Sequence, residues 1–187
     1  MKLDLTVRLT EANARDVTSH QPIAAFSHLG THIDVMGCEF SLDNFSRAGK
    51  LIDVSSVRER EIVVDDFGGV LFEENDFALI YTGFIDRVPY GSHEYFKNHP
   101  ELSLQSIELL LQKKVSLIGI DAPGLRRGPD HPKVDRLCAE KNVFVVENLV
   151  NLDKLVNVPR GQSIIVYTSP FNMAGLTGLP CRVIAEF

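Results

Sequence analysis

Short runs of β-branched and aromatic residues alternate along the chain with segments rich in Gly, Pro, Asn and Asp. This pattern predicts strands, because β-branched and aromatic side chains pack well on a pleated sheet and the turn residues interrupt the runs. The predicted strands are residues 2–9, 28–35, 60–64, 77–83, 115–121, 142–148, 162–168 and 181–187. We therefore expect a sheet to dominate the fold.

Two segments have a helical period instead. In residues 103–114, apolar side chains recur every three or four positions, and Ser103 precedes them as an N-cap. In residues 132–141, Pro132 suits the first helical turn, and Val134, Leu137 and Cys138 are predicted to be buried. Both segments are predicted to be helices that pack on the sheet.

Between residues 77 and 148 the predicted order is strand, helix, strand, helix, strand. Such a βαβαβ order makes part of the sheet parallel, whereas the strand-rich first half and C-terminus favour antiparallel pairing. The chain of 187 residues is long enough to bury one core. We predict an α/β fold with a mixed β-sheet core and flanking helices, in a single domain spanning residues 1–187.

Composition excludes several classes of protein. The chain is 44% hydrophobic and 24% charged, as in soluble globular proteins. A net charge of −6 without a Lys/Arg block argues against a nucleic-acid partner, and no apolar run is long enough for a membrane span.

The N-terminus lacks the apolar segment of a secretory signal, and three cysteines without a CxxC pair fit a reducing cytoplasm. No GxGxxG, GKS/T or GxSxG motif supports a nucleotide fold or a serine hydrolase.

The segment HLGTHIDVMGC, residues 28–38, carries two histidines and an aspartate within seven positions. In a strand, His28, His32 and Asp34 would share one face and a mainly apolar set would occupy the other, because successive side chains alternate. Imidazole and carboxylate together suit zinc, manganese or iron(II). From the spacing alone, a strand with surface histidines explains the segment as well as a metal site does.

Geometry limits the metal interpretation. A straight strand would separate His28 from Asp34 by about 20 Å, at about 3.3 Å per residue. Side chains cannot close that distance around one ion. Either the backbone bends at Gly30, which tolerates dihedrals that other residues avoid, or the segment serves two metals.

The same segment resembles the HxGTHxDxPxH signature of the metal-dependent cyclase family, which includes kynurenine formamidases and isatin hydrolases. The five matching positions are His28, Gly30, Thr31, His32 and Asp34. Later blocks resemble those of the family in the same order: DLT at 4–6, YTGF at 81–84, IGIDAPG at 118–124, VVENLVNLDKL at 145–155 and GLTGLPCRVIAEF at 175–187. The resemblance covers nearly the whole chain.

The resemblance implies a site and a reaction. His28, His32 and Asp34 would bind the metal, Glu147 would serve in a binuclear arrangement and in catalysis, and zinc or manganese would be the cofactor. The implied reaction is hydrolysis of an amide, lactam or lactone-like carbonyl of a small molecule by metal-activated water. The family also implies a swivelling β/β/α fold and a homodimer or homotetramer.

Three positions depart from the family pattern. Met36 replaces the proline of the signature, Cys38 replaces its last histidine, and Asp135 stands where the formamidases have a histidine. Cys38 could be a soft metal ligand, the proton carrier that we predict as catalytic, or a small buried residue without a role. Asp135 could bind metal or lie solvated on a helix, and His131, one helical turn upstream, could substitute if the helix starts early enough.

Other residues are assigned by their context. Phe26 could line an aromatic pocket near the metal, and Arg126 could bind a substrate carboxylate, although core packing and a solvated loop are the alternative explanations. Asp121 resembles a supporting residue of the family. The remaining histidines, His20, His93 and His99, lie in turn-like contexts and are predicted at the surface.

The leading hypothesis from the sequence is a metal-dependent amide hydrolase of the arylformamidase type. The altered positions motivate one alternative, a member of the fold that has lost catalysis and binds a small molecule or a partner. A second alternative is a thiol-dependent enzyme with Cys38 as the nucleophile.

Overall fold

The computed structural model describes residues 1–7, 26–159 and 161–187. The strands are β1 (Lys2–Asp4), β2 (His32–Asp34), β3 (Ser46–Asp53), β4 (Phe77–Tyr81), β5 (Leu117–Ile120), β6 (Phe144–Glu147), β7 (Ile164–Pro170) and β8 (Gly178–Glu186). The α-helices in these residues are α3 (His93–Lys97), α4 (Leu104–Gln112) and α5 (His131–Glu140). Short 3-10 turns begin at Leu42, Val64, Gly128 and Leu152.

One mixed sheet contains all of these strands, in the order β1-β8-β2-β6-β5-β4-β3-β7. The strands β3, β4, β5 and β6 pair in parallel, and the remaining pairs are antiparallel. Because β7 also pairs with β8, the sheet closes on itself in a barrel-like ring. The predicted mixed α/β architecture with a parallel βαβαβ part is confirmed. The closure was not predicted, and the swivelling type implied by the resemblance stays a prediction.

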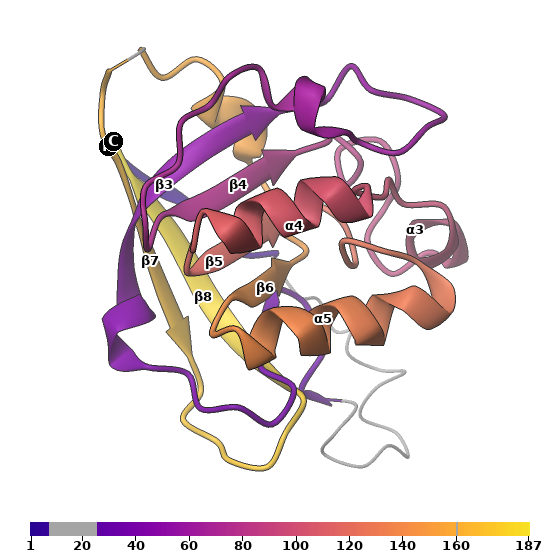
Figure 1. Cartoon of the computed structure of the whole chain (residues 1–187), viewed down its shortest axis with the longest axis vertical. Helices are drawn as coiled ribbons and strands as arrows, with labels where there is room; N and C mark the ends of the chain where they lie inside the picture. Colours follow the sequence, from indigo (N-terminus) through magenta and orange to yellow (C-terminus); the bar gives the residue numbers. More distant parts are fainter. Residues whose placement is uncertain (8–25, 160) are drawn as a thin grey trace.

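The strands separate two hydrophobic clusters. In β6, Phe144 and Val146 point into one cluster and Val145 points into the other, as the two-residue period of a strand requires. Helices α4 and α5 cover the parallel strands on the side of Val145 (Figure 1). Val134 and Cys138 are buried there, as predicted, whereas Leu137 is 43% exposed, so the prediction of its burial was wrong.

Three further sequence predictions needed correction, and two elements had not been predicted. Residues 28–31 form a turn, so that strand begins only at His32, and residues 60–64 contain one isolated bridge, from Ile62 to Leu102. Strand β3 and the short helix α3 were not predicted. His99 is buried at 2% exposure, so its surface prediction was wrong, whereas His93 is exposed and His20 lies outside the described residues.

Strand β3 escaped prediction because its sequence, SRAGKLID, is polar and contains a glycine. Strand β3 pairs with β4 on one edge and with β7 on the other, and these backbone hydrogen bonds stabilise it as a strand. Its side chains do not have the β-branched and aromatic pattern by which strands are predicted. Gly49 is required there, because a Cβ would lie 2.9 Å from Val166 Cγ2.

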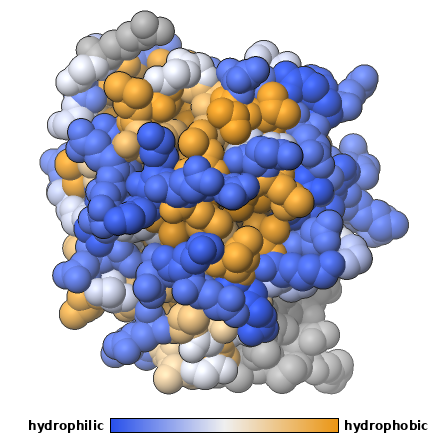
Figure 2. Space-filling model, in the orientation of Figure 1, coloured by the Kyte–Doolittle hydropathy of each residue, from blue (hydrophilic) through white to orange (hydrophobic). Residues whose placement is uncertain are grey.

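The two ends of the chain lie together, and the helices leave a groove on their outer face. The amino group of Met1 donates a hydrogen bond to the carbonyl of Phe187, so the termini lie side by side (Figure 1). Figure 2 shows apolar side chains between polar ones in the middle of the helical face, where a groove between α4 and α5 is lined by residues that include Ile107, Leu111 and Leu137. No helix in the described ranges is long and apolar enough to cross a bilayer.

Candidate metal centre

The register of the sheet brings the first ligand candidates together. His32 of β2 lies directly opposite Glu147 of β6, and its Nε2 is 3.4 Å from Glu147 Oε2. Asp34 shares the face of His32, whereas Ile33 and Val35 pack into the opposite hydrophobic cluster. The alternation of polar and apolar positions predicted from the sequence is confirmed over this strand.

The chain bends at Gly30, which has a φ of 71°. Because of this bend, His28 is not held at the far end of a straight strand. Its Nδ1 lies 3.2 Å from His32 Nε2 and 3.2 Å from Asp34 Oδ1. The bend, the first of the two possibilities that the sequence left open, therefore gathers His28, His32 and Asp34 into one group that could hold a metal ion.

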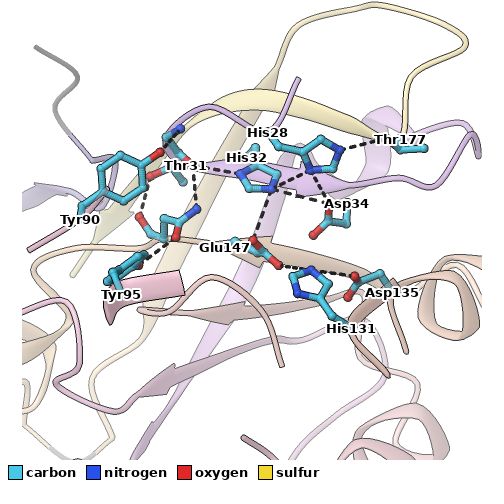
Figure 3. Close-up of polar contacts among 12 residues, drawn as sticks. His28, Thr31, His32, Asp34, Tyr90, Tyr95, His131, Asp135, Glu147 and Thr177 are labelled. Carbon is cyan, nitrogen blue, oxygen red and sulfur yellow. Dashed lines mark hydrogen bonds and ion pairs between the residues drawn. The ribbon is translucent and has the colours of Figure 1, made fainter. Parts of the chain in front are cut away.

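Helix α5 adds a second set of donors to the same place (Figure 3). The helix begins at His131, early enough for this imidazole to face the sheet. His131 Nε2 lies 3.1 Å from Asp135 Oδ2 and 3.1 Å from Glu147 Oε1. The structure thus assembles Asp34, His131, Asp135 and Glu147 as a second group. His131, which the sequence offered only as a substitute, lies in the site beside Asp135.

The site is buried on one side and open on the other. The side chains of His32, Asp34 and Glu147 are 2–4% exposed, whereas 40% of the His28 side chain and 31% of the His131 side chain are exposed. A small molecule would therefore reach the site past these two histidines.

Two carboxylate oxygens in this buried region, Asp34 Oδ2 and Asp135 Oδ1, accept no hydrogen bond, and Glu147 Oε1 is paired with His131 Nε2 at 3.1 Å. Buried carboxylates are normally paired or coordinate a metal, because an unpaired buried charge is costly. Oxygen and imidazole donors within 4.8 Å of one another match the ligand chemistry of a divalent cation. The residues present fit a metal ion.

The two histidines of the signature are oriented by their second nitrogens. His32 Nδ1 donates to the carbonyl of Gly30 at 2.9 Å, because a carbonyl can only accept, and this leaves the lone pair of Nε2 facing Asp34 and Glu147. His28 Nε2 lies 2.9 Å from Thr177 Oγ1. When His28 donates to Thr177, its Nδ1 is free to bind a metal, which is the usual arrangement of ligating histidines.

The electrostatics of the site are those of crowded carboxylates. Burial raises the pKa of Asp34, and the negative charge of Glu147 raises it further. Burial lowers the pKa of His131, but Asp135 and Glu147 outweigh this effect and raise the pKa to about 11. Burial also lowers the pKa of His32, which favours the neutral imidazole that can bind a metal. Positive charge is therefore stabilised at His131, between Asp135 and Glu147, and disfavoured at His32.

Comparison with known proteins identifies the family. The family model described as "Putative cyclase" matches residues 3–126, which is about two thirds of the chain. The chain belongs to the cyclase family. A search of curated proteins finds no match.

Solved structures share the fold of this cyclase-family chain. A predicted metal-dependent hydrolase from Bacillus stearothermophilus is 21% identical with a TM-score of 0.74, and the alignment covers 99% of this chain and 97% of that one. Isatin hydrolase A from Ralstonia solanacearum is 22% identical with a TM-score of 0.75, covering 99% and 91%. Isatin hydrolase A from Labrenzia aggregata is 19% identical with a TM-score of 0.76, covering 99% and 93%.

The structure does not bring Cys38 into either donor group of the described residues. Cys38 is partly buried and packs against the hydrophobic cluster that contains Ile33 and Val35. This position resembles the third of the three roles considered for it, a small packing residue. Its predicted catalytic role stays a prediction.

The structure describes both residues that the sequence predicted to bind substrate. Phe26 is 39% exposed, two positions before His28. Arg126 lies 2.6 Å from Glu61, pairs with Glu101 and donates to the carbonyl of Leu102. Its Nη1 therefore has partners within the protein, whereas its buried Nε has no hydrogen-bond partner.

Asp121 supports the structure, in line with its predicted role. Its Oδ1 accepts hydrogen bonds from the backbone and the hydroxyl of Thr82, and its Oδ2 accepts one from the backbone of Phe84. It thereby ties the end of β5 to the segment that follows β4.

Sequence reasoning missed the residues that hold the signature turn in place. Asn148 accepts a hydrogen bond from the hydroxyl of Tyr95 at 2.8 Å, donates to the carbonyl of Gly30 at 2.9 Å, and accepts from Thr31 Oγ1 through its own carbonyl. The hydroxyl of Tyr90 accepts from the backbone of Gly30 at 2.7 Å. Asn148 follows Glu147, which the sequence had identified, but no local pattern pointed to Tyr90 or Tyr95.

Proposed function

We propose that this protein is a metal-dependent hydrolase of an amide bond, of the arylformamidase type, acting on an N-formyl arylamine such as N-formylkynurenine or on a related cyclic amide or lactone. One observation carries the proposal: His28, His32 and the buried Asp34 offer ligand atoms that all lie within 4.8 Å of one another. Membership in the cyclase family supports it, as do the names of structural neighbours, which are metal-dependent hydrolase and isatin hydrolase.

His28, His32 and Asp34 would hold the cation, with Glu147 beside them. A bound divalent ion supplies a Lewis acid that polarises the substrate carbonyl and lowers the pKa of water. Zinc is the first candidate because two imidazoles contribute, and manganese is the second. Gly30 and Thr177 keep the two imidazoles in the orientation that such binding requires.

The chain's own residues must also move a proton from the attacking water to the leaving nitrogen. Because Cys38 packs outside both donor groups, the carboxylates and the exposed imidazoles are better placed for this step. Glu147, which we predicted to be catalytic, is buried between His32 and His131 and faces both of them. The exposed side of the site, at His28 and His131, leaves room for the aryl or ring portion of a substrate.

Two measurements test this function together. The first is the metal content per chain, by elemental analysis, of untagged wild-type protein and of His32→Ala, with His93→Ala as the matched control because His93 is exposed and outside the site. We expect zinc or manganese in the wild type and in His93→Ala and its loss in His32→Ala. The second is hydrolysis of an N-formyl arylamine and of isatin by the metal-loaded protein, followed by absorbance.

The outcomes separate the alternatives. Metal that depends on His32, with turnover of either substrate, supports the hydrolase. Metal without turnover of any amide or lactone would favour the binding protein that the altered Met36, Cys38 and Asp135 positions suggested. Absence of metal after incubation with zinc and manganese would contradict the proposal. The homodimer or homotetramer, the cytoplasmic location and the small-molecule substrate remain parts of the same proposal.

A further inference from the structure

An apolar groove runs between α4 and α5 on the outer face of the helices (Figure 2). The residues that line it include Ile107 and Leu111 of α4 and Val134 and Leu137 of α5. Ile107 and Val134 form a buried floor, at 1% and 4% exposure, whereas Leu137 is 43% exposed. One chain therefore leaves apolar surface uncovered between two helices that already pack on its core.

The exposure of Leu137 is not explained by the fold of one chain. Leu137 follows Val134 by three positions, so both belong to one apolar stripe of the helix. Val134 packs into the core, whereas Leu137 lines the groove. Leu104, on the opposite helix, lines the same groove and is 58% exposed. Apolar surface that extends past the core in this way is typical of a contact with a second molecule.

Of the described residues that line the groove, two are charged, and they have opposite signs. Glu108 belongs to α4, and Lys141 directly follows α5 on the other side of the groove. Both are exposed, and Glu108 accepts a hydrogen bond of 3.2 Å from Gln112. Nearby Lys114 and Lys133 have acidic partners, whereas no ion pair between described residues includes Glu108 or Lys141. An acid and a base thus flank the apolar centre without pairing within the chain.

The two helices run in the same direction. Helix α4 connects β4 to β5 and α5 connects β5 to β6, and these three strands are parallel (Figure 1). A two-fold axis that stands upright on the groove would set the helices of a second copy antiparallel to those of the first. Antiparallel helices place the positive end of one dipole beside the negative end of the other, which is the favourable orientation. The face can therefore pack on itself.

The same axis matches both the charges and the leucines. Because Glu108 and Lys141 lie on opposite sides of the groove, an axis through their midpoint brings Glu108 of each copy to Lys141 of the other. Leu137 precedes Lys141 by about one helical turn. The rotation carries it to about one turn beyond Glu108 of the other copy, where Leu111 lines the groove. A single arrangement thus pairs opposite charges and covers apolar side chains with apolar side chains.

We propose that the groove between α4 and α5 is the docking surface for a second copy of this chain, which binds about a two-fold axis through reciprocal Glu108–Lys141 pairs around Leu111 and Leu137. This interface specifies a face for the homo-oligomer proposed above and does not depend on the metal site. The helices have 9 and 10 residues, which is about 14 and 15 Å of length. Interfaces this small form reversible complexes, so the dimer should dissociate on dilution.

Sedimentation equilibrium of the untagged full chain at several concentrations measures the dissociation constant of the dimer. The wild type should show a monomer–dimer equilibrium. Leu137→Glu should raise the dissociation constant at least about tenfold, because it places a charge in the apolar centre of the interface. Leu71→Glu is the matched control, since Leu71 is 84% exposed and lies outside the groove, and it should leave the constant unchanged.

Exchange of the two charges tests the reciprocal contact. Glu108→Lys alone and Lys141→Glu alone should each raise the dissociation constant about fivefold or more, because two symmetric attractions become repulsions. The double variant with both substitutions should return to within about threefold of the wild type, since its charges are opposite again. Circular dichroism checks that each variant is folded.

Zero-length carbodiimide cross-linking locates the contact directly. In an equal mixture of unlabelled and nitrogen-15-labelled chains, mass spectrometry should find Glu108 of one isotope joined to Lys141 of the other.

A wild type that stays monomeric at every accessible concentration would overturn this inference. So would an oligomer with the same dissociation constant in Leu137→Glu, because its interface would lie elsewhere. Failure of the double variant to recover would overturn the reciprocal pairing. None of these results changes the metal content or the hydrolysis expected of the site, so the proposed function would stand or fall separately.

Discussion

The side-chain amide of Asn148 donates a hydrogen bond of 2.9 Å to the carbonyl oxygen of Gly30. The same carbonyl accepts the hydrogen bond of His32 Nδ1. Asn148 is in turn held by the hydroxyl of Tyr95, which is fully buried. A tyrosine from α3 therefore helps to orient His32 of β2 through Asn148 and the carbonyl of Gly30.

We expect Tyr95→Phe to lower the free energy of unfolding by about 1–3 kcal/mol, because it leaves Asn148 Oδ1 buried without its donor. Urea denaturation measures the change. Tyr81→Phe is the control, since its hydroxyl bonds to Asp86 at an exposed position and should matter less. Equal losses in the two variants would contradict the structural role of Tyr95.

Thr177→Val should weaken metal binding by His28, His32 and Asp34 by about tenfold, because His28 Nε2 loses the hydroxyl that orients it. Competition with a chromogenic chelator gives the affinity. The matched control is Thr168→Val, in which the lost hydroxyl is buried and has no hydrogen-bond partner. That variant should bind metal as the wild type does, and a comparable weakening there would remove the role assigned to Thr177.

The burial of His99 should make the stability of the fold depend on pH. Burial lowers the pKa of folded His99 to about 4, whereas the unfolded residue takes up its proton near pH 6.5. Between pH 6.5 and pH 4 the unfolded state binds more protons at His99 than the folded state does. The contribution of neutral His99 to the free energy of unfolding is therefore complete above pH 6.5 and is lost as the pH falls toward 4.

His99→Gln should reduce this acid-side loss of stability by roughly 1–3 kcal/mol, because glutamine stays neutral throughout. Denaturation curves of the wild type and the variant between pH 7 and 4.5 measure the difference, and the exposed His93→Gln should keep the wild-type slope. An unchanged slope in His99→Gln would show that His99 is protonated in the folded state.

Cys38→Ala should leave kcat/KM within about threefold of the wild type, because the thiol packs against the hydrophobic cluster and outside both donor groups. A residue that transfers protons would contribute about 100-fold or more. A loss of that size with metal content unchanged would restore the catalytic role predicted from the sequence.

Local sequence was sufficient to predict which side chains share a face, because the period of a strand or helix decides this. His32 and Asp34 share one face and Ile33 the other because a strand alternates its side chains wherever it occurs. The helices α4 and α5 followed from their apolar period and N-terminal residues, and the parallel pairing of β4, β5 and β6 followed from the order of elements.

The sheet closure depended on contacts far apart in the chain. Strand β3 joins β7 through pairs such as Ser46 with Tyr167, and β7 joins β8 through pairs such as Thr168 with Val183. These pairings use backbone groups, which every residue carries, so the side-chain pattern of β3 gave no sign of them. The burial of His99 likewise arises from its neighbours and not from its turn-like sequence.

The sequence by itself determined the donor types, the face that His32 and Asp34 share, and the glycine at which the chain could bend. Only the tertiary structure decided that His131 and Asp135 meet Glu147 and Asp34, because that meeting depends on how α5 packs across the sheet and on the space left by Gly124. Ligands on separate elements converge through packing, and packing is a property of the whole fold.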